Sequence, residues 1–307
     1  MGLLYPFRLH SDIVYVLHFA TTQGNWSKNL VAANIMTDNP LGSQTEHPKQ
    51  YQPEVLYPIP RWASRSLLDI DKKIRMFGLD HWQAYELSWL SSSGKPQVAI
   101  GEFYFNSESE KIVESKSLKL YLNSLNQERY ESTETVRSLI EQDLSSISRS
   151  EVKVVIHSLD EIEDEAFGAR AGKCIDHVDV ELIAQQPDSQ LLNIADVDAD
   201  DEVLYSDLFR SNCPVTGQPD WASIEIRYTG KKIRESSLLQ YLISFREHQG
   251  YHEECAERIF RDIMLKCAPS ELRVGMNFLR RGGLDINVYR STAPVTSDSV
   301  SSRLIRQ

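Results

Sequence analysis

The chain has 307 residues, and its 44 acidic side chains outnumber its 33 lysines and arginines, which gives a formal net charge of −11 at pH 7. That balance argues against a general nucleic-acid-binding protein, because such proteins carry basic surfaces that neutralise phosphates. The length is typical of about two domains. No run approaches the roughly 18 apolar residues of a spanning helix, so no membrane is expected as a partner.

The cysteines and the distribution of charge limit the kinds of site that the protein can have. The four cysteines, at positions 174, 213, 255 and 267, form no CxxC pair and no His/Cys cluster. We therefore expect a cytoplasmic protein with no disulfide framework and no metal site. Residues 151–207 contain 16 acids and 3 bases, whereas residues 208–307 contain 15 bases and 11 acids. The first stretch is expected to be a solvated connector, and the second to bind any anionic ligand.

The N-terminal part shows little periodicity. Residues 1–35 are expected to be either an extension or the product of an upstream start, with Met36 as the real initiator. The apolar run Ile13–Leu17 lacks the basic leader and the cleavage site of a signal peptide. Residues 36–81 are expected to form an irregular arm, with Leu56-Tyr57-Pro58 and Trp62 as candidate anchors to a core.

Residues 82–207 are predicted to form a first α+β unit that ends in the acidic connector. Tyr85–Leu90 and Val98–Phe105 flank a Ser-Ser-Ser-Gly-Lys-Pro turn, a pattern typical of a β-hairpin. Helical periodicity over Ser117–Leu125 and Val136–Ile147, followed by strand-like runs at Val152–His157 and Ile175–Ile183, completes the order ββααββ.

Residues 208–307 repeat that order as a second unit. Five residues of the first unit, Ser117, Leu118, Tyr121, Leu122 and Ser124, recur 120 positions later as Ser237, Leu238, Tyr241, Leu242 and Ser244. The expected elements are a hairpin over Leu208–Val215 and Trp221–Tyr228, helices over Ser237–Phe245 and Glu253–Lys266, and strands over Leu272–Leu279 and Leu284–Tyr289. This repetition predicts an internal duplication of antiparallel α+β units.

The second hairpin carries the strongest candidate site. Thr216-Gly217 is its expected two-residue centre, because Gly accepts the positive φ of such turns. Cys213 and Asp220 would then be cross-strand partners with Cβ atoms about 4.5 to 5.5 Å apart. A thiol and a carboxyl at one spot suit a cysteine nucleophile with a proton donor. The plain alternative is a half-buried cysteine beside a turn-capping aspartate.

Three further motifs admit both a binding and a structural interpretation. The lysines of Glu114–Lys119 could meet phosphates at a helix N-terminus or form its solvent face. Glu253 could accept two N–H donors of a purine-like ring, with His252 beside it, or could simply favour the helix dipole. Arg280-Arg281-Gly282-Gly283 could grip phosphate or form a turn. No Gly-x-Gly-x-x-Gly fingerprint follows a strand, so a nucleotide cofactor would bind outside a Rossmann fold.

Four stretches together carry a family resemblance: ESKSLKLYLNS at 114–124, SNCPVTGQPDW at 211–221, FREHQGYHEECAERIF at 245–260 and RRGGLDIN at 280–287. With them the chain resembles the NADPH-dependent 7-cyano-7-deazaguanine reductases, the QueF nitrile reductases of queuosine biosynthesis. It is most similar to their long type, with two tunnelling-fold (T-fold) units in one chain. The similarity runs from about residue 40 to Gln307, and Tyr251 stands where the family is expected to have Phe.

The resemblance implies specific roles. Cys213 would add to the nitrile carbon to form a thioimide, Asp220 would donate a proton, and two NADPH molecules would reduce the thioimide to 7-aminomethyl-7-deazaguanine. It also implies substrate binding by Val113, Glu114, Ser115, His252 and Glu253, and NADPH binding by Ser115, Lys116, Arg281 and Gly282.

Two alternatives stay open, a metal-dependent cyclohydrolase-like T-fold enzyme and a non-catalytic purine- or pterin-binding T-fold protein. The resemblance also implies a homodimer at least, because two T-fold units in one chain do not complete the family's tunnel and single units present sheet edges that need covering.

Overall fold

The structure, a computed structural model, describes residues 6–9, 12–15, 47–68, 74–160, 170–181, 184, 186–300 and 303–307. The chain divides into two compact units, Met1–Asn39 and Pro40–Gln307. In the first, β1 (Pro6–Leu9) and β2 (Asp12–Tyr15) pair antiparallel. The rest of the predicted extension, residues 1–35, lies outside the described residues. In the described part of the chain, no helix has the length and apolar character needed to span a membrane.

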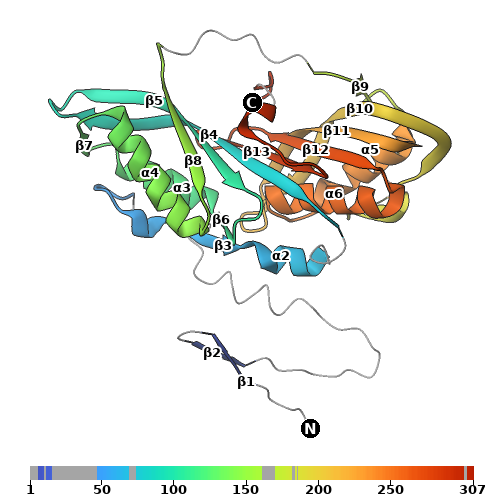
Figure 1. Ribbon diagram of the computed structural model, residues 1–307, viewed down its shortest axis with the longest axis horizontal. Helices are drawn as coiled ribbons and strands as arrows, with labels where there is room; N and C mark the ends of the chain where they lie inside the picture. Colours follow the sequence, from blue (N-terminus) through green and yellow to red (C-terminus); the bar gives the residue numbers. More distant parts are fainter. Residues whose placement is uncertain are drawn as a thin grey trace. The chain divides into compact units, whose positions relative to one another are not determined.

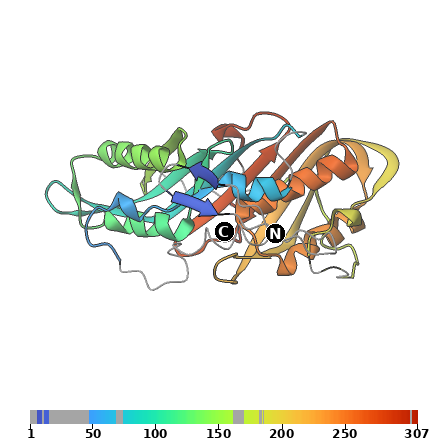
Figure 2. The same cartoon turned by 90° about the horizontal axis from the view of Figure 1, so that it is seen from below.

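The predicted irregular arm over residues 36–81 contains regular structure. Leu56 is buried as expected, but Trp62 is 56% exposed and anchors nothing. The arm is ordered because its helix packs beside the long helix of the second half (Figure 2), where Arg65 pairs with Glu257. Its elements are η1 (Pro53–Val55), β3 (Pro58–Pro60), α2 (Arg61–Leu68) and the first residues of β4 (Phe77–Ser91), which begins ahead of the expected start at Trp82.

One nine-stranded sheet runs through residues 40–307 (Figure 1), in the order β8-β5-β4-β13-β12-β11-β10-β9 with β7 beside β4. β4 and β13 pair antiparallel from Leu284 opposite Ala84 to Ser291 opposite Phe77. Strands from both halves of the chain therefore share one sheet. The remaining strands are β5 (Pro96–Asn106), β6 (Lys111–Val113, paired with β3), β7 (Arg129–Tyr130), β8 (Val152–Ser158), β9 (Lys173–Cys174), β10 (Ile194–Asn212), β11 (Pro219–Ile233), β12 (Glu271–Phe278) and β13 (Leu284–Ser291).

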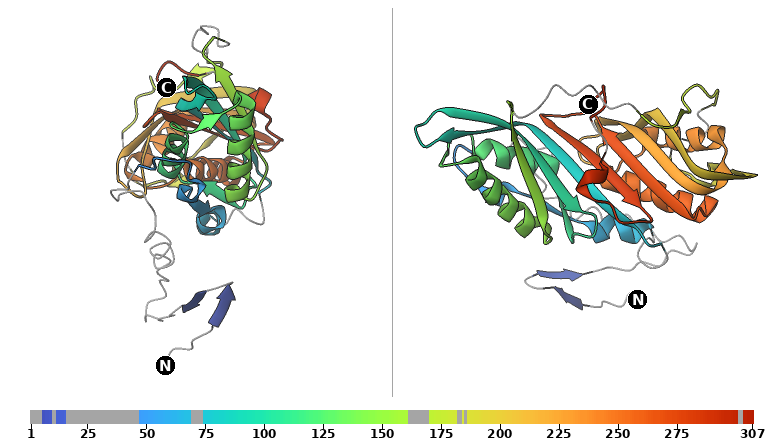
Figure 3. Two further views of the ribbon diagram at one scale, coloured as in Figure 1. Left: turned by 90° about the vertical axis from the view of Figure 1, so that its left-hand side faces the viewer. Right: turned by 45° about the horizontal axis from the view of Figure 1, so that its top comes forward.

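Four main helices pack on one side of this sheet, behind it in the right-hand view of Figure 3. They are α3 (Ser115–Ser124), α4 (Thr133–Ser148), α5 (Glu235–Ile243) and α6 (His252–Cys267). The strand side chains that face them are apolar and join the helices in one buried core that spans both halves. The predicted mixed α+β class with an antiparallel sheet is thus confirmed.

Part of the acidic stretch that was predicted as a connector, residues 194–207, belongs to β10 of the long hairpin β10–β11. The boundary predicted between residues 207 and 208 falls inside β10, because the acids of its outer half face bases on β11. Asp198 lies 3.0 Å from the Lys231 Nζ, and Glu202 lies 3.1 Å from the Lys232 Nζ. Opposite charges across the strands allow the acidic stretch to extend the sheet.

The strand predicted over Ile175–Ile183 is wrong for its described residues, 175–181. Instead β9 pairs with β10 in parallel, and the Ile175 N–H donates to the Tyr205 carbonyl at 3.0 Å. Ile175 is buried, while Val178 and Val180 are partly buried against the core from a loop. The alternation of Val178 and Val180 therefore reflects the packing of this loop against the core, and these residues are not part of a strand.

Candidate active site

The turn between β10 and β11 differs in register from the prediction. Ser211 pairs with Asp220, and the Cys213 N–H donates to the Gln218 carbonyl at 2.8 Å. Gly217 has the expected positive φ, 68°, but it ends a longer turn in which its N–H donates to the Cys213 carbonyl at 3.0 Å. The predicted direct pairing of Cys213 with Asp220 is therefore wrong.

Cys213 and Asp220 still share one face of the hairpin. Because the true register differs from the expected one by two positions, side-chain parity is kept, and the two residues become diagonal neighbours about 7 to 8 Å apart. Cys213 is 9% exposed and Asp220 is 3% exposed. Arg281 donates to Asp220 Oδ1, and His252 Nε2 lies 3.9 Å from the same oxygen.

The N-terminus of α6 supplies an imidazole and a carboxyl. Burial lowers the pKa of His252, with Asp220 opposing and Arg281 adding to the shift, so the ring is neutral near pH 7. Burial, reinforced by Asp80, raises the pKa of Glu253 to about 7. Glu253 is 5% exposed, and its Oε1 has no hydrogen-bond partner among the described residues. A buried acceptor without a partner suits a ligand that brings its own donors.

The N-terminus of α3 is arranged differently. The Glu114 carboxylate caps its own helix, since it accepts from the Lys116 N–H at 2.9 Å and from the Ser117 N–H at 2.7 Å. Burial raises the pKa of Glu114, opposed by these two backbone bonds. Val113 precedes it as the last residue of β6, and Ser115 is the first residue of α3. The segment is fixed by pairing with β3 and by the cap.

All ten residues expected at the site line one cavity of about 550 Å³. Trp82, Tyr251 and Phe278 add aromatic walls to it, and the His252 ring packs edge-on against Phe278 with centroids 4.1 Å apart. The ten are Val113, Glu114, Ser115, Lys116, Cys213, Asp220, His252, Glu253, Arg281 and Gly282. The first four come from the first half of the chain and the other six from the second.

The cavity lining also contains three cationic side chains. They are Lys116, Lys119 and Arg281, and Gly282, which lines the cavity too, has a positive φ of 59°. A Cβ on Gly282 would lie only 3.0 Å from the Lys119 Nζ, so glycine lets this lysine approach the turn. Three cations and a glycine turn in one cavity lining fit a phosphate-bearing cofactor. In this structure Arg281 also donates to the Gln218 side chain.

Comparison with known proteins agrees with this chemistry. A family model described as "Nitrile reductase, 7-cyano-7-deazaguanine-reductase N-term" matches residues 47–156, and one described as "QueF-like protein" matches residues 219–296. A protein of Desulfotalea psychrophila, named NADPH-dependent 7-cyano-7-deazaguanine reductase, is 48% identical over 276 residues, which cover 89% of this chain and 99% of that protein. The chain belongs to the 7-cyano-7-deazaguanine reductase family.

Two further members of this reductase family carry the same name. The protein from Saccharophagus degradans is 49% identical over 83% of this chain and 95% of its own, and that from Burkholderia orbicola is 46% identical over 82% and 93%. A solved structure, the archaeosine synthase QueF-Like in the apo form, covers 32% of this chain at 17% identity with a TM-score of 0.27, a likeness too small to bear on the fold.

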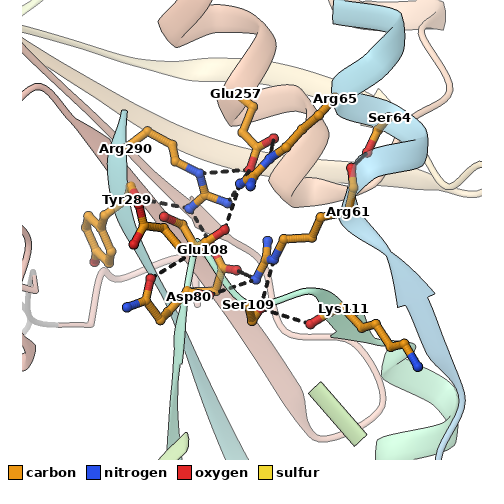
Figure 4. A network of polar contacts seen from close by, with 12 residues as sticks. Arg61, Ser64, Arg65, Asp80, Glu108, Ser109, Lys111, Glu257, Tyr289 and Arg290 are labelled. Carbon is orange, nitrogen blue, oxygen red and sulfur yellow. Dashed lines mark hydrogen bonds and ion pairs between the residues drawn. The ribbon is translucent and has the colours of Figure 1, made fainter. Parts of the chain in front are cut away.

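This reductase-family chain also has a buried ion-pair network that the sequence analysis missed (Figure 4), and its charges act on Glu253 of the cavity lining. Arg61 and Arg65 come from α2, Asp80 from β4, Glu257 from α6 and Arg290 from β13. Arg290 is 0% exposed and Asp80 is 1% exposed. Arg290 comes directly after the strand predicted over Leu284–Tyr289, and nothing in the spacing indicated that it was buried or which partners it had.

Proposed function

We propose that this chain reduces the nitrile of 7-cyano-7-deazaguanine to the primary amine, through a thioimide on Cys213, in queuosine biosynthesis. As a member of its family, the chain is an NADPH-dependent nitrile reductase. The observation that carries the proposed mechanism is that a thiol, a carboxyl and a glutamate with an unpartnered oxygen line one cavity. A thiol nucleophile divides a four-electron reduction into two hydride steps.

The diagonal placement of Cys213 and Asp220 suits the first step. The Cys213 Sγ adds to the nitrile carbon, so a C–S bond forms and one π bond of the nitrile breaks. The nitrogen gains one proton while the thiol loses one, and Asp220 passes it. A separation of about 7 to 8 Å leaves room for the nitrile between thiol and carboxyl, which directly opposed residues would not.

The ring of the substrate is held by groups at the start of α6 and α3. The unpartnered Glu253 carboxylate accepts ring N–H donors, and neutral His252 adds a further hydrogen bond. The segment Val113–Ser115 also lines the cavity. Trp82 and Phe278 supply apolar surface for a planar ring.

Ser115, Lys116, Arg281 and Gly282 would hold the cofactor, which their cationic and glycine character fits. NADPH, when bound, supplies the hydride for each of the two reduction steps. Arg281 would have two roles, because it donates to Asp220 and also lines the cavity beside Gly282.

We also propose that the two halves are T-fold units and that the protein acts in the cytoplasm as a homodimer without nucleic-acid partners. In support, β10, β11, α5, α6, β12 and β13 follow one another in the expected ββααββ order. The strand β8 pairs only with β5 among the described residues, so it leaves a sheet edge for a second copy. All four cysteines are free thiols.

Intact mass and NADPH absorbance test the mechanism together. The wild type mixed with nitrile alone should gain one nitrile molecule in mass, and with NADPH should consume two NADPH per nitrile. Cys213→Ala should lose both, whereas the control Cys174→Ala keeps both because Cys174 lies outside the cavity lining. A Cys213→Ala enzyme that still oxidises NADPH would overturn the thioimide; ligand binding without any oxidation would favour a non-catalytic binding protein.

A further inference from the structure

Arg61 is a buried member of the ion-pair network. Its Nη2 donates to Asp80 Oδ2 at 2.5 Å, and its Nε donates to the Ser109 hydroxyl at 2.9 Å (Figure 4). Its Nη1 is buried and has no hydrogen-bond partner among the described residues. Arg61 is 4% exposed, so this spare donor faces protein interior and no bulk solvent. A guanidinium fixed on two sides with one nitrogen unused points to a third acceptor.

The network leads from Arg61 to the helix that carries Glu253. Arg290 donates to Asp80 Oδ1 at 2.6 Å and to Glu257 Oε1 at 2.9 Å. Glu257 lies one helical turn after Glu253 on α6, so the two carboxyls project from the same helix face. Arg65 closes the network from α2, at 2.7 Å from Glu257 Oε1.

The charges of this network do not balance by themselves. Three guanidiniums, Arg61, Arg65 and Arg290, face two carboxylates, Asp80 and Glu257. A buried charge without a partner is strongly unfavourable. Ionisation of Glu253, whose Oε1 also lacks a partner, supplies the missing negative charge.

We propose that Arg61 is a positioning residue that keeps the Glu253 carboxylate ionised and oriented for the paired N–H donors of the bound ring. This inference rests on the proposed role of Glu253 in ring binding. Arg61 itself touches no substrate, since it is absent from the cavity lining. Its effect passes through the electrostatic interaction of its charge with Glu253.

The charges around Glu253 shift its pKa in the directions that this role of Arg61 requires. Burial and Asp80 raise the pKa of Glu253, while Arg61 and Arg290 oppose the rise. Loss of the Arg61 charge should therefore raise this pKa further, which leaves Glu253 protonated at neutral pH. The other titratable or charged groups around it are Glu257, His252 and Tyr251 near the start of α6, Glu114 and Lys116 at α3, Cys213 and Asp220 on the hairpin, and Arg281 in the last turn.

The test is the pH dependence of 7-cyano-7-deazaguanine binding, measured by calorimetry in a Cys213→Ala background that cannot form the adduct. Arg61→Gln should weaken binding about tenfold at neutral pH for each unit of pKa displacement. The loss should be recovered as the pH is raised, because Glu253 then ionises. Arg61→Lys keeps the charge but cannot serve both Asp80 and Glu253, so it should give a smaller displacement in the same direction.

The matched control is Arg65→Gln, which removes a charge from the same network at a side chain that bonds Glu257 from a more exposed position. It should lower the melting temperature and displace the pH midpoint of binding less than Arg61→Gln does, because Arg61 and Arg290, and not Arg65, are the cations that act most strongly on Glu253. An unchanged midpoint in Arg61→Gln, or a loss equal at every pH, would overturn the inference; should Arg61→Gln not fold, Arg61→Lys decides in the same way. If the Cys213→Ala background itself binds no nitrile, the proposed function fails instead.

Discussion

The helices α4 and α6 are counterparts in the two halves of the molecule. Both have 16 residues, and α6 begins 119 positions after α4. Both end in a residue with left-handed φ, Arg149 at 54° and Ala268 at 45°. In each helix, the eleventh residue is an aspartate that accepts a hydrogen bond from a tyrosine hydroxyl of the preceding helix. Tyr121 donates to Asp143 at 2.6 Å, and Tyr241 donates to Asp262 at 2.7 Å.

Their second residues, both glutamates, behave in opposite ways. Glu134 of α4 is exposed and pairs with Arg137, which lowers its pKa to about 2. Glu253 of α6 is buried and interacts electrostatically with Arg61 and Asp80, and burial raises its pKa. The same residue at the same helix position is a surface ion pair in one half and a ring-binding candidate in the other. What packs against the helix end, rather than the helix itself, makes the site.

The largest effect is expected where the two hairpins differ. Asp220 follows Pro219 on β11, as Gln97 follows Pro96 on β5, but only Asp220 lines the cavity. Asp220→Asn should lower turnover about 10²- to 10⁴-fold, the range for loss of a general acid, whereas Gln97→Ala should leave it unchanged. Steady-state NADPH oxidation measures both. Equal turnover in Asp220→Asn and wild type would remove the distinction between the hairpins.

Next comes the pair of glutamates. Glu253→Gln should weaken nitrile binding about 100-fold, because an amide cannot accept both ring donors, and Glu134→Gln should not. For the wild type, the raised pKa of Glu253 means that the carboxylate form is lost as the pH falls through about 7, so affinity should drop on acidification. Calorimetric titration over a pH series checks this. Persistence of the acid-side loss in Glu253→Gln would assign it to another group.

A smaller effect is expected at the cofactor side. α3 has Lys116 in its first turn, while α5 has Ser236 at the corresponding place. Lys116→Ala should raise the KM for NADPH about tenfold, the cost of one phosphate contact, without preventing adduct formation with the nitrile. Lys95→Ala, on the exposed turn of the first hairpin, is the control. A change in nitrile adduct formation with unchanged KM for NADPH would contradict the assignment.

The smallest effect is expected for the tyrosine–aspartate hydrogen bond that occurs in both halves. Tyr121→Phe and Tyr241→Phe each remove one buried hydrogen bond, yet each aspartate keeps another donor, Tyr51 for Asp143 and Arg261 for Asp262. Each substitution should lower the free energy of unfolding by about 1 kcal/mol and leave NADPH oxidation intact. Chemical denaturation gives the values. A much larger cost in one half would show that the two contacts are not equivalent.

Local sequence patterns determined the elements whose residues pack by simple periodicity. The apolar spacing of residues 136–147 and of Glu253–Lys266 marks α4 and α6, and the turn residues around Gly94 and Gly217 mark both hairpins. The family resemblance that four short motifs carry also named ten residues that line a single cavity. These features depend on neighbours close in the chain, which a sequence displays directly.

Tertiary structure alone decided the register of Cys213 with Asp220, the extension of β10 through the acidic stretch and the loss of the strand over Ile175–Ile183. It also decided the surroundings of α2, whose Arg61 pairs with Asp80 of β4 and interacts electrostatically with Glu253, nearly 200 residues away. Each of these outcomes depends on cross-strand charge pairing, turn length or burial against distant segments. Such contacts leave no periodic trace in the chain, because their free energy arises only after the two halves share one sheet and one core.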